Sequence, residues 1–458
     1  MIHHPVRTEM TALLRLATPL VGANLLQMMV YASDVVFVAR LGTETLAAAT
    51  LGVYLYSVVM FALIGLVGAA APLIAAERGA RSHAVREVRR TVRMALWLAV
   101  AASVPFMLLL SQGDTILVAI GQDPAVSARA DGFLDIMVWA MIPAVASGAL
   151  RGAVAALGRP GWALAVTALA LATNVLGNWL LVFGHWGLPA LGLHGSAIAS
   201  VVTSVMMMLA YAAILIVDPR IRRYRLFGRW WRAEWPRFGQ LVRLGVPIAV
   251  TMTFEGALFS AAAFLMGLIG VTEVAAHAVA LQIAAIAFQV PYGLAQAATI
   301  RVGLAYGGRD PAAVGRAGWV ALAAGTGFMV ATAAVIWIAP RLLVSAYVDV
   351  AAPENARMVA LAIQYLGVAA MFQLFDGAQV VAAGALRGLQ DTRVPMIVAG
   401  AGYWIAGFGM SVLLGLWLGW QGLGVWIGLA IGLAVVSLLL LWRWTARERL
   451  GLVRFAAA

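Results

Sequence analysis

The stretch Arg15-Leu-Ala-Thr-Pro-Leu-Val-Gly-Ala-Asn-Leu-Leu-Gln-Met-Met-Val-Tyr-Ala-Ser-Asp34 combines an apolar run with a carboxylate at its end. Roughly 20 apolar residues are enough for a helix to cross a bilayer. A charged side chain near the bilayer centre costs about 3 kcal/mol or more, so the few that occur there usually have a function. Glu255 and Asp376 also lie inside long apolar stretches. Ion sites, proton relays and substrate counter-charges are the usual roles, and the pattern predicts a membrane transporter driven by an ion gradient.

The composition is that of a polytopic, all-α membrane protein. Of the 458 residues 63% are hydrophobic and 11% are charged, and the mean hydropathy is +0.94, whereas soluble domains have about 45–50% apolar and about 25% charged residues. The length leaves room for about twelve spans with short loops. We predict spans near 13–39, 46–71, 94–112, 133–152, 162–183, 192–217, 244–269, 274–300, 317–340, 358–384, 394–417 and 420–442.

The arginines predict the orientation of the chain. The net charge is +12 and there is no lysine, and the arginines concentrate between residues 77 and 93, 218 and 243, 301 and 316, and 443 and 454. The alternate connections hold few, namely Arg40, Arg129, Arg341 and Arg357. Because cytoplasmic loops carry an excess of basic residues, we expect both termini in the cytoplasm of a multi-pass bacterial inner-membrane protein. This distribution explains the basic charge without nucleic acid, which we do not expect as a partner.

The chain contains an internal repeat. Arg15-Leu-Ala-Thr-Pro19 matches Arg243-Leu-Gly-Val-Pro247, a displacement of 228 residues (15 to 243) that also pairs Gly42 with Gly270 and Gly79 with Gly307. Ala149-Leu-Arg-Gly152 likewise matches Ala385-Leu-Arg-Gly388. Gly148-x-x-x-Gly152 and Gly384-x-x-x-Gly388 are also typical of close helix packing.

The repeat predicts two similar lobes. Six spans per half is an even number, so both halves keep the same orientation and we expect a pseudo-two-fold axis along the membrane normal. The lobes are residues 1–217 and 241–458, joined by a basic, Trp-rich linker at 218–240 that we expect on the anionic, lipid-covered cytoplasmic face. We expect a monomer that binds substrate between its lobes.

A polar stripe follows one face of the first span. Asn24, Gln27, Tyr31 and Asp34 are three, four and three residues apart, which places them on one helical face. A single polar residue in a span often only bonds a neighbouring helix, but four that end in a carboxylate favour the lining of a water-filled cavity. At the repeat displacement Gln27 pairs with Glu255, and Asp34 pairs with Ala262. The fold therefore tolerates neutral residues at both positions, which indicates functional roles for the carboxylates.

Helix geometry predicts two separate acidic sites. At about 1.5 Å per residue, Glu255 lies roughly 18 Å from Arg243, and Asp376 lies roughly 16 Å from Arg387 on a span of opposite direction. The two carboxylates therefore share a depth, and we expect them to form one site that holds a proton or a cation such as Na⁺, because two close carboxylates in low dielectric do not both stay ionised alone. Asp34, roughly 28 Å past Arg15, forms a separate site nearer the periplasm. No arginine lies in mid-span, so we expect none to reach these residues.

Further residues are candidates for the substrate cavity. The polar ones are Asn174, Asn178, Gln282, Gln289, Gln373 and Gln379, and each of them either lines the cavity or bonds a neighbouring helix. The apolar ones are Phe259, Phe288, Tyr292 and Phe372, which suit an adaptable wall for varied substrates, although packing in the core is the commoner role of such residues.

Several absences exclude enzyme classes. Without lysine there is no Walker A motif, and neither G-x-S-x-G nor H-E-x-x-H occurs. Cysteine is absent, and no His/acid spacing predicts a bound metal cofactor. We therefore expect no cofactor and no catalytic residues, and the carboxylates are too deep and too few for a membrane-embedded enzyme. Carboxylates at different depths in two similar lobes also suit alternating access better than a passive channel.

With these features in place, the chain resembles the multidrug and toxic compound extrusion (MATE) family, in particular its NorM-like bacterial branch. The resemblance covers nearly the whole chain. It is carried by the first span up to Asp34, by Ala71-Pro-Leu-Ile-Ala-Ala-Glu-Arg-Gly79, and by Gln289-Val-Pro-Tyr-Gly-Leu-Ala-Gln-Ala-Ala-Thr-Ile-Arg-Val-Gly303 with Gly307. It implies that cationic, lipophilic drugs are exported in exchange for Na⁺ or H⁺ by alternation between outward- and inward-open states.

The resemblance also assigns roles to the acidic residues. Glu255 and Asp376 match the C-lobe cation site of the family, and Asp34 matches its N-lobe acidic residue. Some relatives place a Tyr one helical turn before the span-ten Asp, where this chain has Phe372; the missing hydroxyl puts Na⁺ specificity in doubt. A flippase for lipid-linked or polysaccharide substrates is the alternative within the superfamily, but it would require basic groups for a pyrophosphate.

Overall fold

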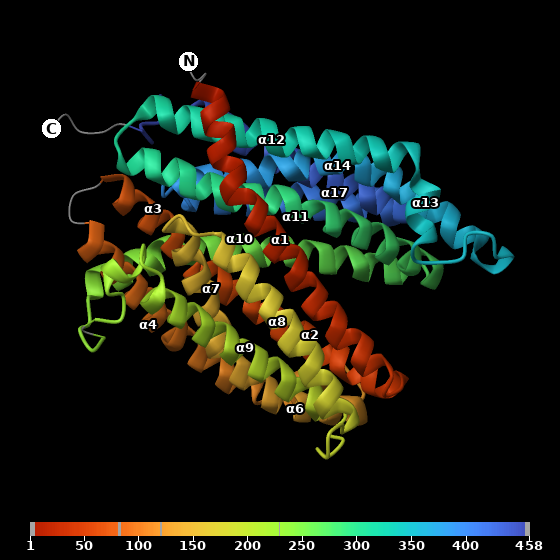
Figure 1. The fold of residues 1–458 in the computed structure, drawn as a ribbon. Coiled ribbons are helices and arrows are strands. Elements are labelled where there is room, and N and C mark those ends of the chain that lie inside the picture. The colour runs from red at the N-terminus through yellow and green to blue at the C-terminus, as the bar shows by residue number, and fades with distance from the viewer. Residues whose placement is uncertain (1–4, 81–83, 120, 229, 454–458) are drawn as a thin grey trace. The chain divides into compact units, whose positions relative to one another are not determined.

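The computed structural model describes residues 5–80, 84–119, 121–228 and 230–453, and Figure 1 shows their arrangement. These residues are helical with no strand among them, and twelve of their helices are long and apolar enough to cross a membrane. Each helix overlaps one of the predicted spans, so the prediction of an all-α protein with twelve spans is confirmed. Arg81, Arg229 and Arg454, which belong to the basic stretches, lie outside the described residues.

The chain folds into two compact units whose boundaries lie inside helices. Unit 1 contains residues 1–21 and 250–458, and unit 2 contains residues 22–249. The boundaries fall after Val21 in α1 (Pro5–Ala39) and after Ala249 in α10 (Trp235–Ile269). These positions are 228 residues apart, the displacement of the sequence repeat. The first helix of each half therefore begins among helices of the other half. The predicted lobes, which follow the repeat and not the packing, stay a prediction.

Unit 2 is built from the remaining helices of the first half. They are α2 (Thr43–Val67), α3 (Ala70–Ala80), α4 (Ala84–Leu110), α5 (Gly113–Ala119), α6 (Pro124–Met137), a 3₁₀ turn (Val138–Ala140), α7 (Met141–Ala156), α8 (Gly161–Phe183), α9 (Leu193–Val217) and a 3₁₀ turn (Arg222–Tyr224). α9 packs against α6, α7 and α8, and α2 packs against α6.

Unit 1 contains the corresponding helices of the second half. They are α11 (Val271–Gly307), α12 (Pro311–Ile338), α13 (Pro340–Ser345), a 3₁₀ turn (Pro353–Asn355), α14 (Ala356–Gly388), α15 (Arg393–Gly400), a π-helical segment (Ala401–Phe408), α16 (Gly409–Val412), a second π-helical segment (Leu413–Trp417) and α17 (Gln421–Thr445). α14 packs against α11, α12 and α17, as Figure 1 shows. The core between them is formed by aliphatic and aromatic side chains such as Tyr365, Phe372 and Trp426.

Two helices extend further into the basic stretches than their apolar residues predict. α4 begins at Ala84, ten residues before the predicted span, and α10 begins at Trp235, inside the predicted linker. Ion pairs support these polar extensions: the Arg237 guanidinium contacts Glu77 at 2.8 Å and Glu87 at 2.6 Å. Apolar periodicity missed these helical turns because paired charges, and not burial in lipid, stabilise them.

The predicted close packing at the paired glycines is confirmed. A Cβ atom on Gly384 would lie 2.5 Å from the Ala295 carbonyl oxygen, and one on Gly148 would lie 2.8 Å from Ile64 Cδ1. The short distance between α11 and α14 lets the Thr299 hydroxyl donate a hydrogen bond to the Gly384 carbonyl at 2.8 Å. Small residues thus let the helix backbones meet, which is how spans associate in the absence of a hydrophobic driving force.

We expect Gly384→Ala to destabilise the protein by about 1–3 kcal/mol, because the new methyl group would have to displace backbone atoms of α11. The measurement is the thermal midpoint of the purified protein in detergent. Gly367→Ala is the matched control on the same helix, since nothing lies within 4 Å of the position of its Cβ. Equal midpoints for the two variants would contradict the close contact.

Asp218 joins the start of α8 to the end of α9. Its Oδ2 accepts hydrogen bonds from Arg159 Nε at 2.9 Å and from Trp162 Nε1 at 2.8 Å, and its Oδ1 accepts from the Arg220 amide at 2.9 Å. Burial works to raise the pKa of the Asp218 carboxyl, but the hydrogen bonds and the guanidinium charge outweigh it and hold this pKa below its ordinary value of 3.8. The ionised carboxylate therefore stabilises the fold.

Asp218→Asn should lower the thermal midpoint by several degrees at neutral pH. A depressed pKa contributes stability that is present above pH 3.8 and is lost as the pH falls below 3.8 towards the pKa of the folded state. The difference between wild type and variant should therefore shrink in strong acid. Asp349→Asn, at an exposed site, controls for the substitution itself. A difference that does not change with pH would refute this role.

Candidate functional site: two buried carboxylate clusters

The first cluster, in unit 1, joins two of the predicted carboxylates through one amide. Gln379 Nε2 donates to Asp376 Oδ1 at 3.2 Å and to Glu255 Oε1 at 3.5 Å. Asp376 and Gln379 are three residues apart on α14 and share a helical face, while Glu255 comes from α10. The structure therefore brings Glu255 and Asp376 to the same amide group.

Tyr403 fixes the orientation of this amide. Its hydroxyl donates to Gln379 Oε1 at 2.9 Å, which leaves the Nε2 hydrogens facing the carboxylates. Tyr403 is fully buried and lies in the π-helical segment between α15 and α16. Such segments re-aim side chains and are frequent at functional sites. Sequence analysis missed Tyr403, because a tyrosine in an apolar span does not differ in pattern from a core residue.

The second cluster, in unit 2, surrounds Asp34. Its Oδ1 accepts from Asn174 Nδ2 at 2.9 Å and from Asn178 Nδ2 at 2.7 Å, and its Oδ2 accepts from the Ser200 hydroxyl at 3.3 Å. Ser33 Oγ donates to Asn174 Oδ1 at 2.5 Å. Four uncharged side chains thus arrange the surroundings of one carboxylate. Asn174 and Asn178 were predicted, whereas Ser200 was missed because a lone hydroxyl in an apolar span is common.

Both clusters offer oxygen atoms that suit a proton or a small hard cation. Carboxylate, amide and hydroxyl oxygens are the ligands that hard cations prefer. No group of three or more His, Cys, Asp or Glu side chains capable of holding a metal ion occurs in the described part of the chain. Any bound Na⁺ would therefore rely on neutral oxygens beside Glu255 and Asp376, or beside Asp34.

The comparisons with known proteins decide the family. The MatE family model matches residues 19–180 and 247–413, one copy in each half of the repeat. The chain belongs to the MatE family. Among its relatives, the probable multidrug resistance protein NorM of Mesorhizobium japonicum is 50% identical over 444 residues, which cover 97% of this chain and 95% of that protein. The multidrug resistance protein NorM of Burkholderia vietnamiensis is 37% identical over 431 residues, 94% of this chain and 92% of that protein.

Solved structures agree on the fold. The crystal structure of the eukaryotic MATE transporter AtDTX14 has a TM-score of 0.85 with 21% identity, and the match covers 97% of this chain and 99% of that one. An outward-facing multidrug resistance MATE transporter of the MOP superfamily has a TM-score of 0.85 with 20% identity, covering 98% and 97%. The family resemblance seen in the sequence is thereby confirmed, and so is the prediction that this multi-pass membrane protein is not an enzyme.

Two arginines that the sequence analysis left aside reach the polar residues of this MatE protein. Arg151 donates a hydrogen bond to Asn24 Oδ1, and Arg387 interacts electrostatically with Glu255. Both belong to the repeated Ala-Leu-Arg-Gly motif. The expectation that no arginine reaches these residues is therefore wrong: each arginine lies near the end of its span, but its long side chain extends along the helix towards the polar group.

The other predicted cavity residues of the MatE protein have varied surroundings. Tyr31 is 63% exposed, whereas Phe372 is 2% exposed and packs on Trp426 at a ring distance of 5.5 Å. Gln373 accepts a hydrogen bond from Thr332 at 3.3 Å. Of the remaining residues, Gln27, Gln289, Phe259, Phe288 and Tyr292 are half-buried, with Phe288 stacked on Tyr292, and Gln282 is exposed. The role of all these residues as a cavity wall stays a prediction.

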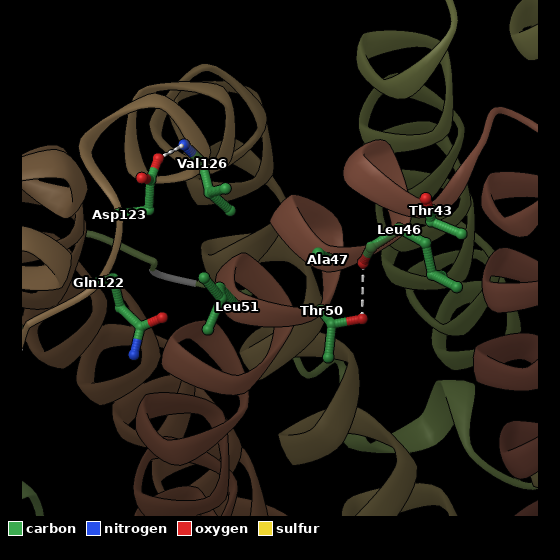
Figure 2. Close-up of a pocket in the computed structure, with 8 residues that line it drawn as sticks. All are labelled: Thr43, Leu46, Ala47, Thr50, Leu51, Gln122, Asp123 and Val126. Atoms are coloured by element: carbon green, nitrogen blue, oxygen red, sulfur yellow. Dashed lines mark hydrogen bonds between the residues drawn. The ribbon is translucent and has the colours of Figure 1, made fainter.

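An open pocket of about 530 Å³ lies elsewhere in unit 2, and Figure 2 shows it. It is lined by Thr43, Leu46, Ala47, Thr50, Leu51, Gln122, Asp123 and Val126, none of them a predicted site residue. Asp123 accepts from the Val126 amide at 3.2 Å, and the Thr50 hydroxyl donates to the Leu46 carbonyl at 2.7 Å. Because these polar groups are already used by their own helices, the pocket is not a candidate site.

Gln379→Met should destabilise the protein more at alkaline than at acidic pH. The variant removes the amide that serves both carboxylates, and an ionised group that loses a donor costs about 1–3 kcal/mol, whereas a protonated one needs it less. The measurement is the thermal midpoint across pH. Tyr403→Phe keeps the amide but frees its orientation, so we expect a smaller effect in the same direction. The same loss at every pH would contradict this reading of the cluster.

Proposed function

We propose that this chain is an antiporter that exports cationic, lipophilic compounds in exchange for H⁺ or Na⁺. The observation that carries the proposal is the pair Glu255 and Asp376, held by the single amide of Gln379 inside a membrane-spanning unit. Membership of the MatE family, and relatives named multidrug resistance proteins, support export as the direction of transport.

The pair has the chemistry of a coupling site. One amide donates at most two hydrogens, while two ionised carboxylates offer four acceptor oxygens. Two negative charges in a low dielectric repel each other, so a proton or a cation that binds between them is strongly stabilised. The guanidinium of Arg387 supplies part of the missing positive charge when the site is empty. The pair therefore changes its charge balance with occupancy, as a coupling site requires.

Coupling follows if occupancy shifts a conformational equilibrium. A ligand shifts an equilibrium only by its difference in affinity for the two states. We propose that H⁺ or Na⁺ binds the outward-open state more tightly at Glu255 and Asp376, and also at Asp34, and that the drug binds the empty state. Alternation between the states then exchanges one for the other without an open channel.

The proposed setting is the bacterial inner membrane, with both termini in the cytoplasm and the protein as a monomer among lipids. The arginine-rich connections support this orientation, since positive charge is retained on the cytoplasmic side. The acidic clusters favour positively charged substrates, and the apolar side chains of the spans favour lipophilic ones.

The experiment is ethidium transport in vesicles that contain the purified protein, with a proton or a Na⁺ gradient imposed separately. We expect one gradient to drive transport, and Glu255→Gln to reduce it to the level of empty vesicles while membrane insertion is unchanged. The control is Glu44→Gln, the same substitution at a side chain that is 77% exposed; it should transport normally.

Unchanged transport in Glu255→Gln would remove Glu255 from the coupling site. A folded protein that moves no ethidium under either gradient would instead favour the flippase alternative, for which Arg151 and Arg387 supply the basic groups. Lipid-linked substrates would then be the next probe.

A further inference from the structure

A second group of buried polar side chains lies in unit 1, outside the carboxylate pair. His277 on α11 is 1% exposed, and neither of its ring nitrogens has a hydrogen-bond partner among the described residues. A neutral imidazole carries one donor and one acceptor. Leaving buried polar groups unpaired costs about 1–3 kcal/mol each, so a buried imidazole with two free nitrogens indicates an occupant.

The neighbours of His277 share this property. Its ring meets the edge of Trp426 on α17 at 5.4 Å, and Tyr365 on α14 stacks on the same indole at 6.1 Å. Within the described residues, Trp426 Nε1 and the Tyr365 hydroxyl also lack hydrogen-bond partners. Three helices thus bring together a donor-only group and two groups that both donate and accept, a set that water satisfies well. Buried waters typically make about three such hydrogen bonds.

Charged groups connect this cluster to the end of the unit. Glu273 lies one helical turn before His277 on α11 and has a 5% exposed side chain, and it accepts a hydrogen bond from Arg357 at 2.9 Å. The Arg357 side chain is 73% exposed. In the other helices of this unit the charged groups lie further away by sequence: Arg316 on α12, Arg341 on α13, Glu255 on α10 and Arg443 on α17. Glu273 and Arg357 therefore form the contact between solvent and the cluster.

On the inner side, the cluster leads towards the carboxylate pair. Trp426 also contacts Phe372, which precedes Asp376 by one turn of α14. Gln373 is 1% exposed, and its Nε2 has no hydrogen-bond partner in the described part of the chain. Along α14 the unpaired groups of Tyr365 and Gln373 precede Asp376 by roughly 16 Å and roughly 5 Å of helix rise. Unsatisfied polar atoms thus mark a path from Glu273 to Asp376.

We propose that Glu273, His277, Tyr365 and Trp426 form a buried water-binding site that relays protons between the outer end of α11 and Asp376. The relay needs no charged imidazole at rest. Water delivers a proton to one ring nitrogen, the other nitrogen releases its own proton to the next water, and an O–H bond forms on the Asp376 carboxylate. The inference rests on the proposed function in one respect: Asp376 must take up the coupling cation, here a proton.

The water site is tested without transport, by radiolytic hydroxyl labelling of the full-length protein in nanodiscs, read out by mass spectrometry. Ordered water beside a buried side chain makes it label despite its burial. We expect Trp426 and Tyr365 to label several-fold faster than Tyr403, a matched control that is equally buried and whose hydroxyl is already bonded to Gln379. Rates equal to that of Tyr403 would overturn the water site.

The relay is tested by His277→Phe, which keeps a ring but removes both nitrogens, and by His277→Gln, which keeps a donor and an acceptor. In vesicles, His277→Phe should slow proton-driven ethidium exchange several-fold with unchanged ethidium affinity, and His277→Gln should recover part of the rate. Normal exchange in His277→Phe would overturn the relay. Exchange driven by Na⁺ alone would also overturn it but leave the proposed antiport intact, whereas wild-type protein that exchanges under neither gradient would refute the proposed function while the labelling result stands.

Discussion

An ionised carboxylate inside a bilayer is stable only where neighbouring helices supply donors or opposite charge, and this constraint explains much of the structure. Asp34 receives hydrogen bonds from Asn174, Asn178 and Ser200, and Glu255 and Asp376 share the amide of Gln379. Donors of this kind act only at short range, so the helices that carry them must pack closely. Glycine at positions such as Gly384 permits that packing by letting the backbones of two spans meet.

The two halves apply one scaffold to different charge patterns. Gln27 in the first half corresponds to Glu255 in the second, and Asp34 corresponds to Ala262. The arginine of the Ala-Leu-Arg-Gly motif, in contrast, occurs in both halves, and in each it faces a polar group: Asn24 for Arg151, and Glu255 for Arg387. The fold thus keeps the positive partner constant and varies the position of the acid, which gives each unit a site of its own.

Ion pairs at the helix ends follow the repeat with reversed signs. In unit 1, Glu9 at the start of α1 pairs with Arg301 of α11, and in unit 2, Arg237 at the start of α10 pairs with Glu77 of α3. Glu9 and Arg237 occupy equivalent repeat positions, 228 residues apart. Each pair fixes the first turns of a helix from one half against a helix from the other half. This exchange explains why the boundaries of the packed units fall inside α1 and α10 and not in the connection between the halves.

The sequence by itself determined the number of spans, the repeat, the family and the three carboxylates, because apolar length, repeated motifs and a charge within an apolar run are local properties of the chain. Local patterns did not predict the partners of those carboxylates. Ser200, Tyr403, Arg151 and Arg387 approach the polar clusters only because α9, the π-helical segment and the ends of α7 and α14 lie beside them in space. The same holds for His277, whose unpaired nitrogens are a property of its neighbours on α14 and α17. Tertiary packing decided these contacts, since hydrogen bonds over a few ångströms depend on which helices meet and not on the order of residues within each helix.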